Sequence, residues 1–402
     1  MGILDINPTL EKASPGIRNP VNASKFYGTR IYVDNYRWLY ANMALAHKSV
    51  IMETDVLREE PDRKKSMRLV IQIFLDFYIK WVSLKLYPVI GFDGKSAPEK
   101  CSAHKKRNKS KIATQEKIEA FKEKLKTQDL LTMPDPKEYK KLLAQKNWIS
   151  RDEITEFKEL VKNLGIPYLV ATGEAEKLGS SLVIEGKCSS IFTTDTDPLA
   201  YGSPSTIVDL RSEGNSATGP LFSVTETRID DCYNALGLDR KRFVDFCILL
   251  GCDYNDRIFG YGPVKALKLI KEYGCIENIQ KAGIDISSLN YEFCRNEFSY
   301  VESKELIESG CIYPREINND NMTVVREVLE KYGLLGYIDK IIKCNQNTPK
   351  DISITKVNIP GMPKLNIVKR LQVEEKKEFN DTREIGDINL TNVTNNFINL
   401  TM

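Results

Sequence analysis

The chain has 402 residues, of which 42% are hydrophobic and 28% charged, and its formal net charge is +3. This length suits two lobes or one large α/β unit, and so small a net charge does not by itself indicate nucleic-acid binding. No stretch approaches eighteen uncharged apolar residues, and the start, MGILDINPTLEK, lacks the basic residues and apolar core of a secretion signal. We therefore expect no membrane attachment, and nine cysteines without a C-x-x-C pair indicate reduced thiols in an intracellular protein.

The first predicted elements are two apolar strands that each end at an aspartate. The segment TRIYVDNY predicts a strand that ends at Asp34, and PVIGFDG predicts one that ends at Asp93. Residues 66–86, between these strands, have the spacing of a helix.

A basic run follows the second strand. Residues 100–111 contain six lysines or arginines and no acid. Such a run is typical of a solvated helix, a nuclear import signal or a nucleic-acid contact. Residues 112–163 have helical spacing, with a break over residues 132–139.

The middle of the chain predicts a βαβ unit. Residues 165–171 predict a strand, residues 174–186 a helix, and a further strand opens at Ile191. A helix that ends at Gly251 comes later, followed by the glycine turn FGYGP and a second amphipathic helix over residues 264–274. We expect helices up to about residue 345 and a flexible, Asn-rich remainder.

Acidic residues lie close to the ends of four predicted strands: Asp34, Asp93, Glu174 and Asp195. Because the carboxyl ends of parallel strands line the crevice of an open α/β sheet, we expect these acids to gather along one edge. Three further acids, Glu176, Asp197 and Asp253, would join them, which makes seven. Taken singly, Glu174 and Glu176 also fit the N-terminus of a helix, Asp253 also fits a position just past a helix end, and a D-x-D pair also occurs in surface turns.

The stretch TTDTDP sets Asp195 and Asp197 around a single threonine. In an extended segment these two carboxylates point the same way and repel each other unless a cation lies between them. A lone D-x-D pair also occurs in sugar transferases and phosphatases, but an all-oxygen set of seven acids suits Mg²⁺ or Mn²⁺ rather than Zn²⁺. Two such ions predict phosphodiester hydrolysis.

These residues stand in blocks that resemble the structure-specific 5′ nucleases of the flap endonuclease and xeroderma pigmentosum group G type. The blocks are MGI, IYVDNYRWLY, PVIGFDGKSAPEK, GIPYLVATGEAE, TTDTDPLAYGSP and FCILLGCDYNDRIFGYGPVKALKLI, in family order over about residues 1–280. The resemblance implies an α/β, three-layer PIN-like nuclease fold with a mainly parallel central sheet, a helical arch and a helix, two-turn, helix module. It divides the chain into residues 1–107 (nuclease region), 108–150 (arch), 151–280 (nuclease region with the module), 281–347 (helical region) and 348–402 (flexible tail).

The resemblance also assigns roles to residues of this chain. Asp34, Asp93, Glu174 and Glu176 would surround one Mg²⁺, and Asp195, Asp197 and Asp253 would complete the second ion and the outer shell. Lys100 and Arg107 would bind the scissile phosphate, and Gly2 would pack beside the site. Further DNA contacts would come from Tyr40, Lys105, Lys106, Gly260, Gly262 and Lys265, with K⁺ at the glycine turn. By pattern alone, Tyr40 fits core packing on a helix.

The implied activity is Mg²⁺-dependent cleavage of DNA at 5′ flaps or junctions, in replication, repair or recombination. The alternatives are a catalytically silent DNA-binding or scaffolding relative, and a D-x-D nucleotide-sugar transferase. The tail has no Q-x-x-[ILM]-x-x-aromatic-aromatic peptide, so we expect no sliding-clamp partner. We expect a monomer in the nucleus or, if the chain is virus-encoded, in the host nucleus or cytoplasm.

Overall fold

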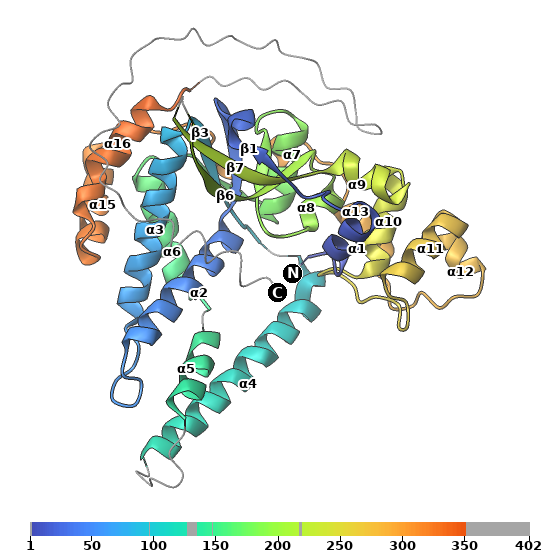
Figure 1. The fold of residues 1–402 in the computed structure, drawn as a ribbon, viewed down its shortest axis with the longest axis horizontal. Coiled ribbons are helices and arrows are strands. Elements are labelled where there is room, and N and C mark those ends of the chain that lie inside the picture. The colour runs from blue at the N-terminus through green and yellow to red at the C-terminus, as the bar shows by residue number, and fades with distance from the viewer. Residues whose placement is uncertain (1, 96, 127–134, 147, 217–218, 351–402) are drawn as a thin grey trace.

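The computed structural model describes residues 2–95, 97–126, 135–146, 148–216 and 219–350 (Figure 1). The expectation of a flexible tail therefore lies almost wholly outside the described residues. Among the described helices, none is long and apolar enough to span a bilayer.

An eight-stranded sheet forms the centre of the molecule, in the order β1-β7-β6-β5-β2-β3-β4-β8 (Figure 1). The strands are β1 (Asn19–Asn22), β2 (Thr29–Asp34), β3 (Leu86–Phe92), β4 (Tyr168–Ala171), β5 (Ser190–Phe192), β6 (Ser205–Ser216), β7 (Gly219–Arg228) and β8 (Ile307–Cys311). The five central neighbours, from β6 to β4, run parallel, whereas β1, β7 and β8 pair antiparallel at the two sides. The expected α/β fold with a mainly parallel central sheet is confirmed.

Helices cover both faces of the sheet, because successive residues of its central strands are apolar and point in turn to its two sides. Val33 and Ile90 pack into one buried cluster, and their neighbours Tyr32 and Val89 pack into another. The first cluster is closed by α2 (Asn35–Glu53), α3 (Arg63–Ser83), α6 (Arg151–Asn163), α15 (Asn319–Lys331) and α16 (Ile338–Asn347). The second is closed by α7 (Ala175–Ile184). The result is three layers.

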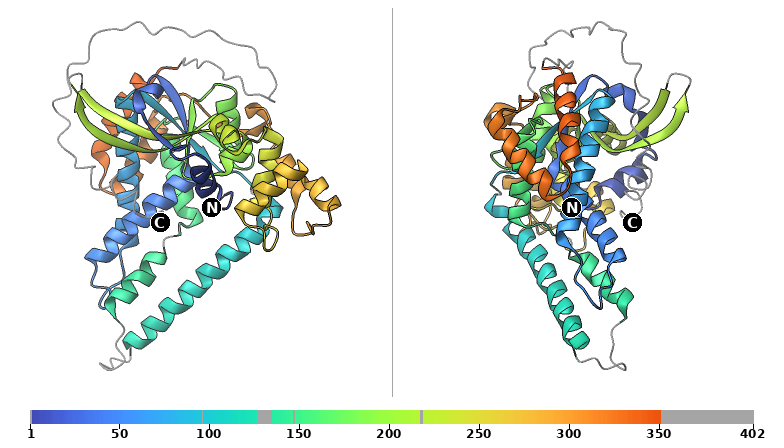
Figure 2. Two further views of the ribbon diagram at one scale, coloured as in Figure 1. Left: turned by 45° about the vertical axis from the view of Figure 1, so that its right-hand side comes forward. Right: turned by 90° about the vertical axis from the view of Figure 1, so that its left-hand side faces the viewer.

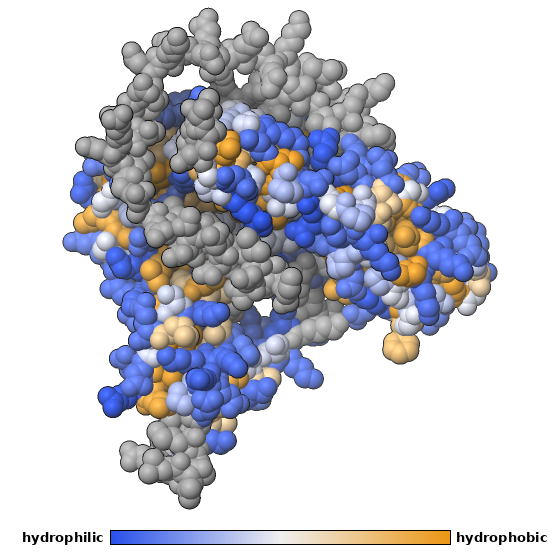
Figure 3. Space-filling model, in the orientation of Figure 1, coloured by the Kyte–Doolittle hydropathy of each residue, from blue (hydrophilic) through white to orange (hydrophobic). Residues whose placement is uncertain are grey.

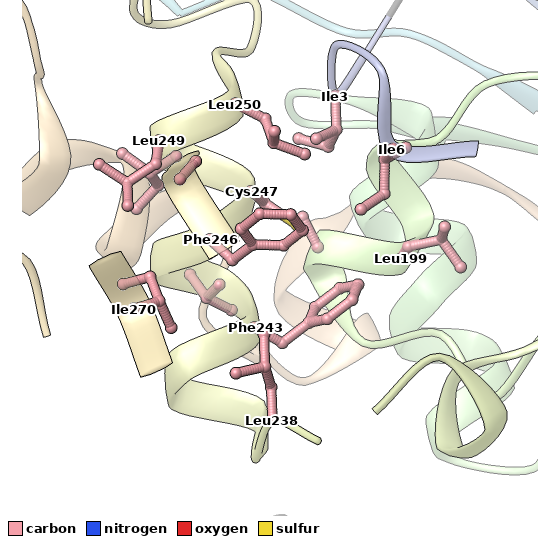
Figure 4. Close-up of a cluster of buried hydrophobic side chains, with 14 of the residues drawn as sticks. Ile3, Ile6, Leu199, Leu238, Phe243, Phe246, Cys247, Leu249, Leu250 and Ile270 are labelled. Carbon is pink, nitrogen blue, oxygen red and sulfur yellow. The ribbon is translucent and has the colours of Figure 1, made fainter. Parts of the chain in front are cut away.

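A third cluster joins the N-terminus to the helices beside the sheet. It is built from α1 (Ile6–Ala13), α8 (Asp197–Tyr201), α9 (Ile229–Leu236), α10 (Arg240–Leu250), α11 (Pro263–Tyr273), α12 (Ile276–Lys281) and α13 (Tyr291–Glu297). Figure 4 shows Ile3 and Ile6 pointing toward Leu250 and Leu199 in this cluster. The backbone N–H of Leu4 donates to the carbonyl of Gly251 (3.0 Å). These contacts fix the first residues against α8 and α10.

Two helices project from the body below the sheet edge. They are α4 (Cys101–Lys126) and α5 (Pro136–Gln145), and both further views show them extending away from the sheet (Figure 2). Ile118 of α4 and Tyr139 of α5 are buried with Ile51 at the end of α2. The projecting pair is therefore packed against the body at its far end.

The structure corrects several sequence-based boundaries. The helix expected over residues 66–86 runs from Arg63 to Ser83, because Leu86 already belongs to β3. The helical spacing was expected from residue 112, yet α4 begins at Cys101, so the basic run after Lys100 is helical, which was one of its expected structures. The break in helical spacing that was expected over residues 132–139 falls partly outside the described residues.

Beyond residue 203, the sheet is larger than the sequence suggested. Strands β6 and β7 form an antiparallel hairpin that was not predicted. The expectation that residues 281–345 are wholly helical is wrong at β8, which pairs with the edge of β4. The other described elements there are α13, α14 (Ser303–Leu306), α15, α16 and the 3₁₀ turn η3 (Leu335–Tyr337). Earlier 3₁₀ turns are η1 (Ala23–Phe26) and η2 (Pro98–Lys100).

We predict that Gly179→Ala destabilises the fold. A Cβ on Gly179, in α7, would lie 2.4 Å from Cδ1 of the buried Tyr32. The free energy of unfolding should fall by about 1–3 kcal/mol through overpacking, although alanine favours helices over glycine. Urea unfolding measures the change. The control is Gly336→Ala, whose Cβ meets nothing within 4 Å, and equal losses in both variants would contradict the prediction.

Candidate active site

The sheet order brings four acid-bearing strand ends together. Strands β5, β2, β3 and β4 are consecutive neighbours and parallel, so their carboxyl ends share one edge. Asp34 ends β2, Asp93 follows β3, Glu174 follows β4 and Asp195 follows β5. Glu176 lies in the first turn of α7, Asp197 begins α8, and Asp253 follows α10.

The sequence predicted that the D-x-D pair lies in an extended segment, and this prediction is wrong. Strand β5 ends at Phe192, and α8 begins at Asp197, with Pro198 in its first turn. The two carboxylates nevertheless converge. The Oδ1 atoms of Asp195 and Asp197 lie 2.0 and 3.1 Å from the point that a Cβ on Gly2 would occupy.

Mutual repulsion links the acids electrostatically. Burial, followed by the charge of Asp34, raises the pKa of Asp93 to about 7. Burial and then the charge of Asp195 raise the pKa values of Glu176 and Asp197 well above the usual carboxyl range. Burial also raises the pKa of Asp34, with a contribution from Asp195. The acids therefore occupy one electrostatic site rather than separate surface positions.

Backbone amides and one hydroxyl hold the acids in place. The backbone N–H of Ala175, in the first turn of α7, donates to Oδ1 of Asp93 (2.9 Å). Thr193 donates its hydroxyl to Oδ2 of Asp34 (2.7 Å), and the same hydroxyl oxygen accepts from the N–H of Asp195 (3.0 Å). Thr193 thus ties the end of β2 to the loop after β5.

Two cationic side chains enter the site from η2 and α4. The buried Lys100 donates through Nζ to Oε2 of Glu174 (2.6 Å) and lies 3.8 Å from Oδ2 of Asp253. Arg107, two turns further along, donates through Nη2 to the same Oδ2 (2.7 Å). The Nζ of Lys100 also lies 5.3 Å from the ring centre of Tyr254. The helical basic run therefore starts inside the acid cluster.

The donor set fits hard divalent cations. Three buried oxygens have no hydrogen-bond partner in the described part of the chain: Oε1 of Glu174, Oε1 of Glu176 and Oδ1 of Asp197. Buried, unpaired carboxylate oxygens are costly unless a cation meets them. Among the described residues, however, no three His, Cys, Asp or Glu side chains already stand in ligating geometry. Lys100 holds the other oxygen of Glu174, and Arg107 holds Oδ2 of Asp253.

Gly2 packs directly against the D-x-D loop of the site. Its φ of +101° lies in the region that favours glycine. An added Cβ would lie 2.0 Å from Oδ1 of Asp195 and 2.7 Å from Oγ1 of Thr196. No other residue type fits this position without moving the D-x-D loop.

The remaining predicted contacts are spread over α2, α4 and the turn before α11. The half-buried Tyr40 contacts Tyr36, with ring centres 4.8 Å apart and the ring planes tilted by 44°, and packs against the helical core. Lys105 is exposed on α4, whereas the side chain of Lys106 lies outside the described part. Of the turn residues, Gly260 and Lys265 are exposed and Gly262 is partly exposed and caps α11; Lys265 donates to the carbonyl of Gly260 (3.1 Å).

Two residues of the site were missed from the sequence. Arg37 lies in the first turn of α2, with Nε 3.6 Å from Oδ2 of Asp195. Thr193 stands two residues before Asp195. The position of each residue could have pointed to the site. Arg37 lies in the helix turn that begins at Asp34, and Thr193 stands two residues before Asp195, so both face the same crevice as these acids.

Comparison with known proteins places this site in a family. Residues 165–253 match the XPG I-region family model. Flap endonuclease 1 of Brugia malayi is 28% identical over 338 residues, covering 84% of this chain and 82% of the relative. Flap endonuclease 1 of Komagataella phaffii is 26% identical over 390 residues, covering 96% and 98%.

Solved structures share the fold. Flap endonuclease-1 of Methanococcus jannaschii has a TM-score of 0.53 at 16% identity, covering 83% of this chain and 97% of that one. The catalytic core of Rad2 in complex with DNA substrate also scores 0.53, at 18% identity, covering 85% and 98%. With the acids at one sheet edge and the matched I-region, the chain is similar in sequence to the flap endonuclease and XPG nucleases and shares their fold.

Proposed function

We propose that this protein is a metal-dependent, structure-specific 5′ nuclease that cuts DNA at flaps or junctions and leaves a 5′ phosphate and a 3′ hydroxyl. The observation that carries the proposal is the convergence of acids from four adjacent strand ends beside Lys100 and Arg107. Relatives named flap endonuclease 1 and the DNA-bound Rad2 core support it. The role would be in replication, repair or recombination.

The cofactor would be two Mg²⁺ ions, for which Mn²⁺ can substitute. One ion would be held by Asp34, Asp93, Glu174 and Glu176, and the other by Asp195 and Asp197 with Asp253. Such ions, when bound, supply an activated water nucleophile and stabilise charge on the leaving oxygen. The unpaired oxygens of Glu174, Glu176 and Asp197 are the ligands that the chain leaves open.

The chain itself positions the phosphate. Lys100 and Arg107 stand against the acids, where cationic donors would meet the oxygens of a phosphodiester that approaches the cluster. Donors fixed by the fold stabilise charge that develops in the transition state without a cost of reorganisation. Asp34 and Asp93 are held by Thr193 and by the amide of Ala175, so the floor of the site is rigid.

Contacts outside the site would select the DNA structure. Helix α4, with the exposed Lys105 and with Lys106 next to it in the sequence, would attract a single strand through its backbone charge. The turn with Gly260 and Gly262, together with Lys265, would meet the duplex, with K⁺ at the turn. Hydrophilic residues predominate on the face drawn in Figure 3, and hydrophobic ones lie there in small groups. We expect a monomer in the nucleus without a sliding-clamp peptide.

The rival reading is a catalytically silent DNA-binding relative. All seven acids stand in the chain, which favours the active reading. A nucleotide-sugar transferase would not require the helical basic run or the glycine turn. Incubating the protein with Mg²⁺ and a labelled 5′ flap separates the three, because only the nuclease releases a short 5′ product and, of the other two, only the silent relative binds the flap.

We predict that Asp195→Ala retains the fold and flap binding but lowers the rate of cleavage at least about 100-fold, because a metal ligand is lost. Single-turnover cleavage and fluorescence anisotropy measure the two properties. The matched control is Asp320→Ala, an exposed acid in the first turn of α15. Cleavage by Asp195→Ala at the control's rate would refute the assignment.

We predict that Lys100→Ala slows the chemical step about 100-fold and changes the Kd for flap DNA by less than about tenfold, because its charge acts mainly in the transition state. The control is Lys105→Ala, whose exposed side chain should affect Kd rather than rate. A loss in Kd alone for Lys100→Ala would make it a docking residue.

We predict that Gly2→Ala lowers cleavage about 100-fold, because the added Cβ displaces the carboxylate of Asp195. Gly28→Ala is the control, since Gly28 also has a positive φ (+77°) but its Cβ meets nothing within 4 Å. Equal activity in the two variants would contradict the prediction, because the Cβ at position 2 would then not disturb Asp195.

A further inference from the structure

The guanidinium of Arg37 makes fewer contacts with the described residues than its hydrogen-bond donors allow. The residue lies on the first turn of α2, and its backbone N–H donates to Oδ1 of Asp34 (3.3 Å). Its guanidinium has one side-chain partner among the described residues, Asp195, at 3.6 Å from Nε to Oδ2. The same Nε is buried and makes no hydrogen bond, while 36% of the side chain remains exposed.

This arrangement differs from a structural ion pair of the same chain. Arg295 donates through Nε and Nη2 to the two carboxylate oxygens of Asp245, both at 2.6 Å, and joins α13 to α10. Two parallel, charge-assisted bonds are the geometry by which a guanidinium holds a carboxylate. Arg37 makes neither bond. A buried donor without an acceptor costs free energy. The unpaired Nε of Arg37, in this site, therefore indicates a ligand that supplies an acceptor.

The position of Arg37 identifies the chemistry of that ligand. Lys100 and Arg107 reach Glu174 and Asp253 from η2 and α4, whereas Arg37 reaches Asp195 from α2. A guanidinium placed beside the acid cluster and open to solvent suits a phosphodiester, which offers two anionic oxygens to a planar fork.

We propose that Arg37 binds a phosphate oxygen of the DNA strand at the cut, as a third cationic contact in addition to Lys100 and Arg107. The proposal rests on the proposed function, because it assumes DNA in this site. Arg37 would act with the phosphate at the cut or with one of its immediate neighbours, since it contacts the D-x-D loop itself.

The test is a double-mutant cycle between the side chain and single phosphates. Arg37→Met keeps an unbranched, flexible stem and removes the guanidinium with its charge. Flap substrates carry a neutral methylphosphonate at the predicted cut or at one of the two flanking phosphates. Single-turnover cleavage and Kd are measured for each combination, and Arg37→Lys shows whether charge alone suffices.

With unmodified DNA, Arg37→Met should lower the cleavage rate or affinity about 10- to 100-fold, the effect of one charged hydrogen bond. Neutralising the contacted phosphate should cost the wild-type protein a similar factor and cost Arg37→Met almost nothing more. Arg326→Met, an exposed arginine on α15, should behave as the wild type.

Additive losses at all three phosphates would overturn the proposal and leave Arg37 as a residue that only positions Asp195. Unchanged cleavage and affinity in Arg37→Met would also overturn it. If the wild-type protein bound the flap without cutting it, the proposed function would fail, while the same cycle in Kd would still decide the role of Arg37.

Discussion

The main physical constraint on this structure is the repulsion among several carboxylates that the fold holds in one poorly solvated site. Like charges in a pocket raise one another's pKa values, and burial adds to the effect. Burial and neighbouring charge raise the pKa of Asp93 to about 7, and they raise the pKa values of Glu176 and Asp197 well above the usual carboxyl range. A fold that only needed to be stable would not gather these groups.

The fold offsets part of the repulsion with fixed dipoles and cations. Asp34 caps α2, and Asp93 accepts a bond from an amide in the first turn of α7, where helix N-termini favour negative charge. Lys100 supplies a full positive charge at Glu174. The remaining unpaired oxygens are those that a divalent cation would take. The same arrangement that makes the site costly therefore prepares it for metal-assisted phosphate chemistry.

Much of this site could be predicted because strand ends in a parallel sheet obey a topological rule. Four apolar runs, each followed by an acid, were sufficient to expect that Asp34, Asp93, Glu174 and Asp195 meet, and the structure brings them to one edge. Other features depend on tertiary contacts that leave no local pattern. Strand β8 has no apolar alternation and forms only because the edge of β4 offers it hydrogen bonds. The start of α8 at Asp197 follows from Pro198, and the contact of Arg37 with Asp195 follows from the approach of α2 to the loop after β5.

The central claim, that the gathered acids hold divalent cations, is tested most directly by counting bound Mn²⁺ with electron paramagnetic resonance, using the full chain and a flap DNA. The account predicts about two tightly bound Mn²⁺ per chain, and one or fewer in Asp197→Asn, which keeps the shape of the side chain but removes its charge. Less than one bound ion in the wild-type protein, or the same number in both proteins, would contradict it.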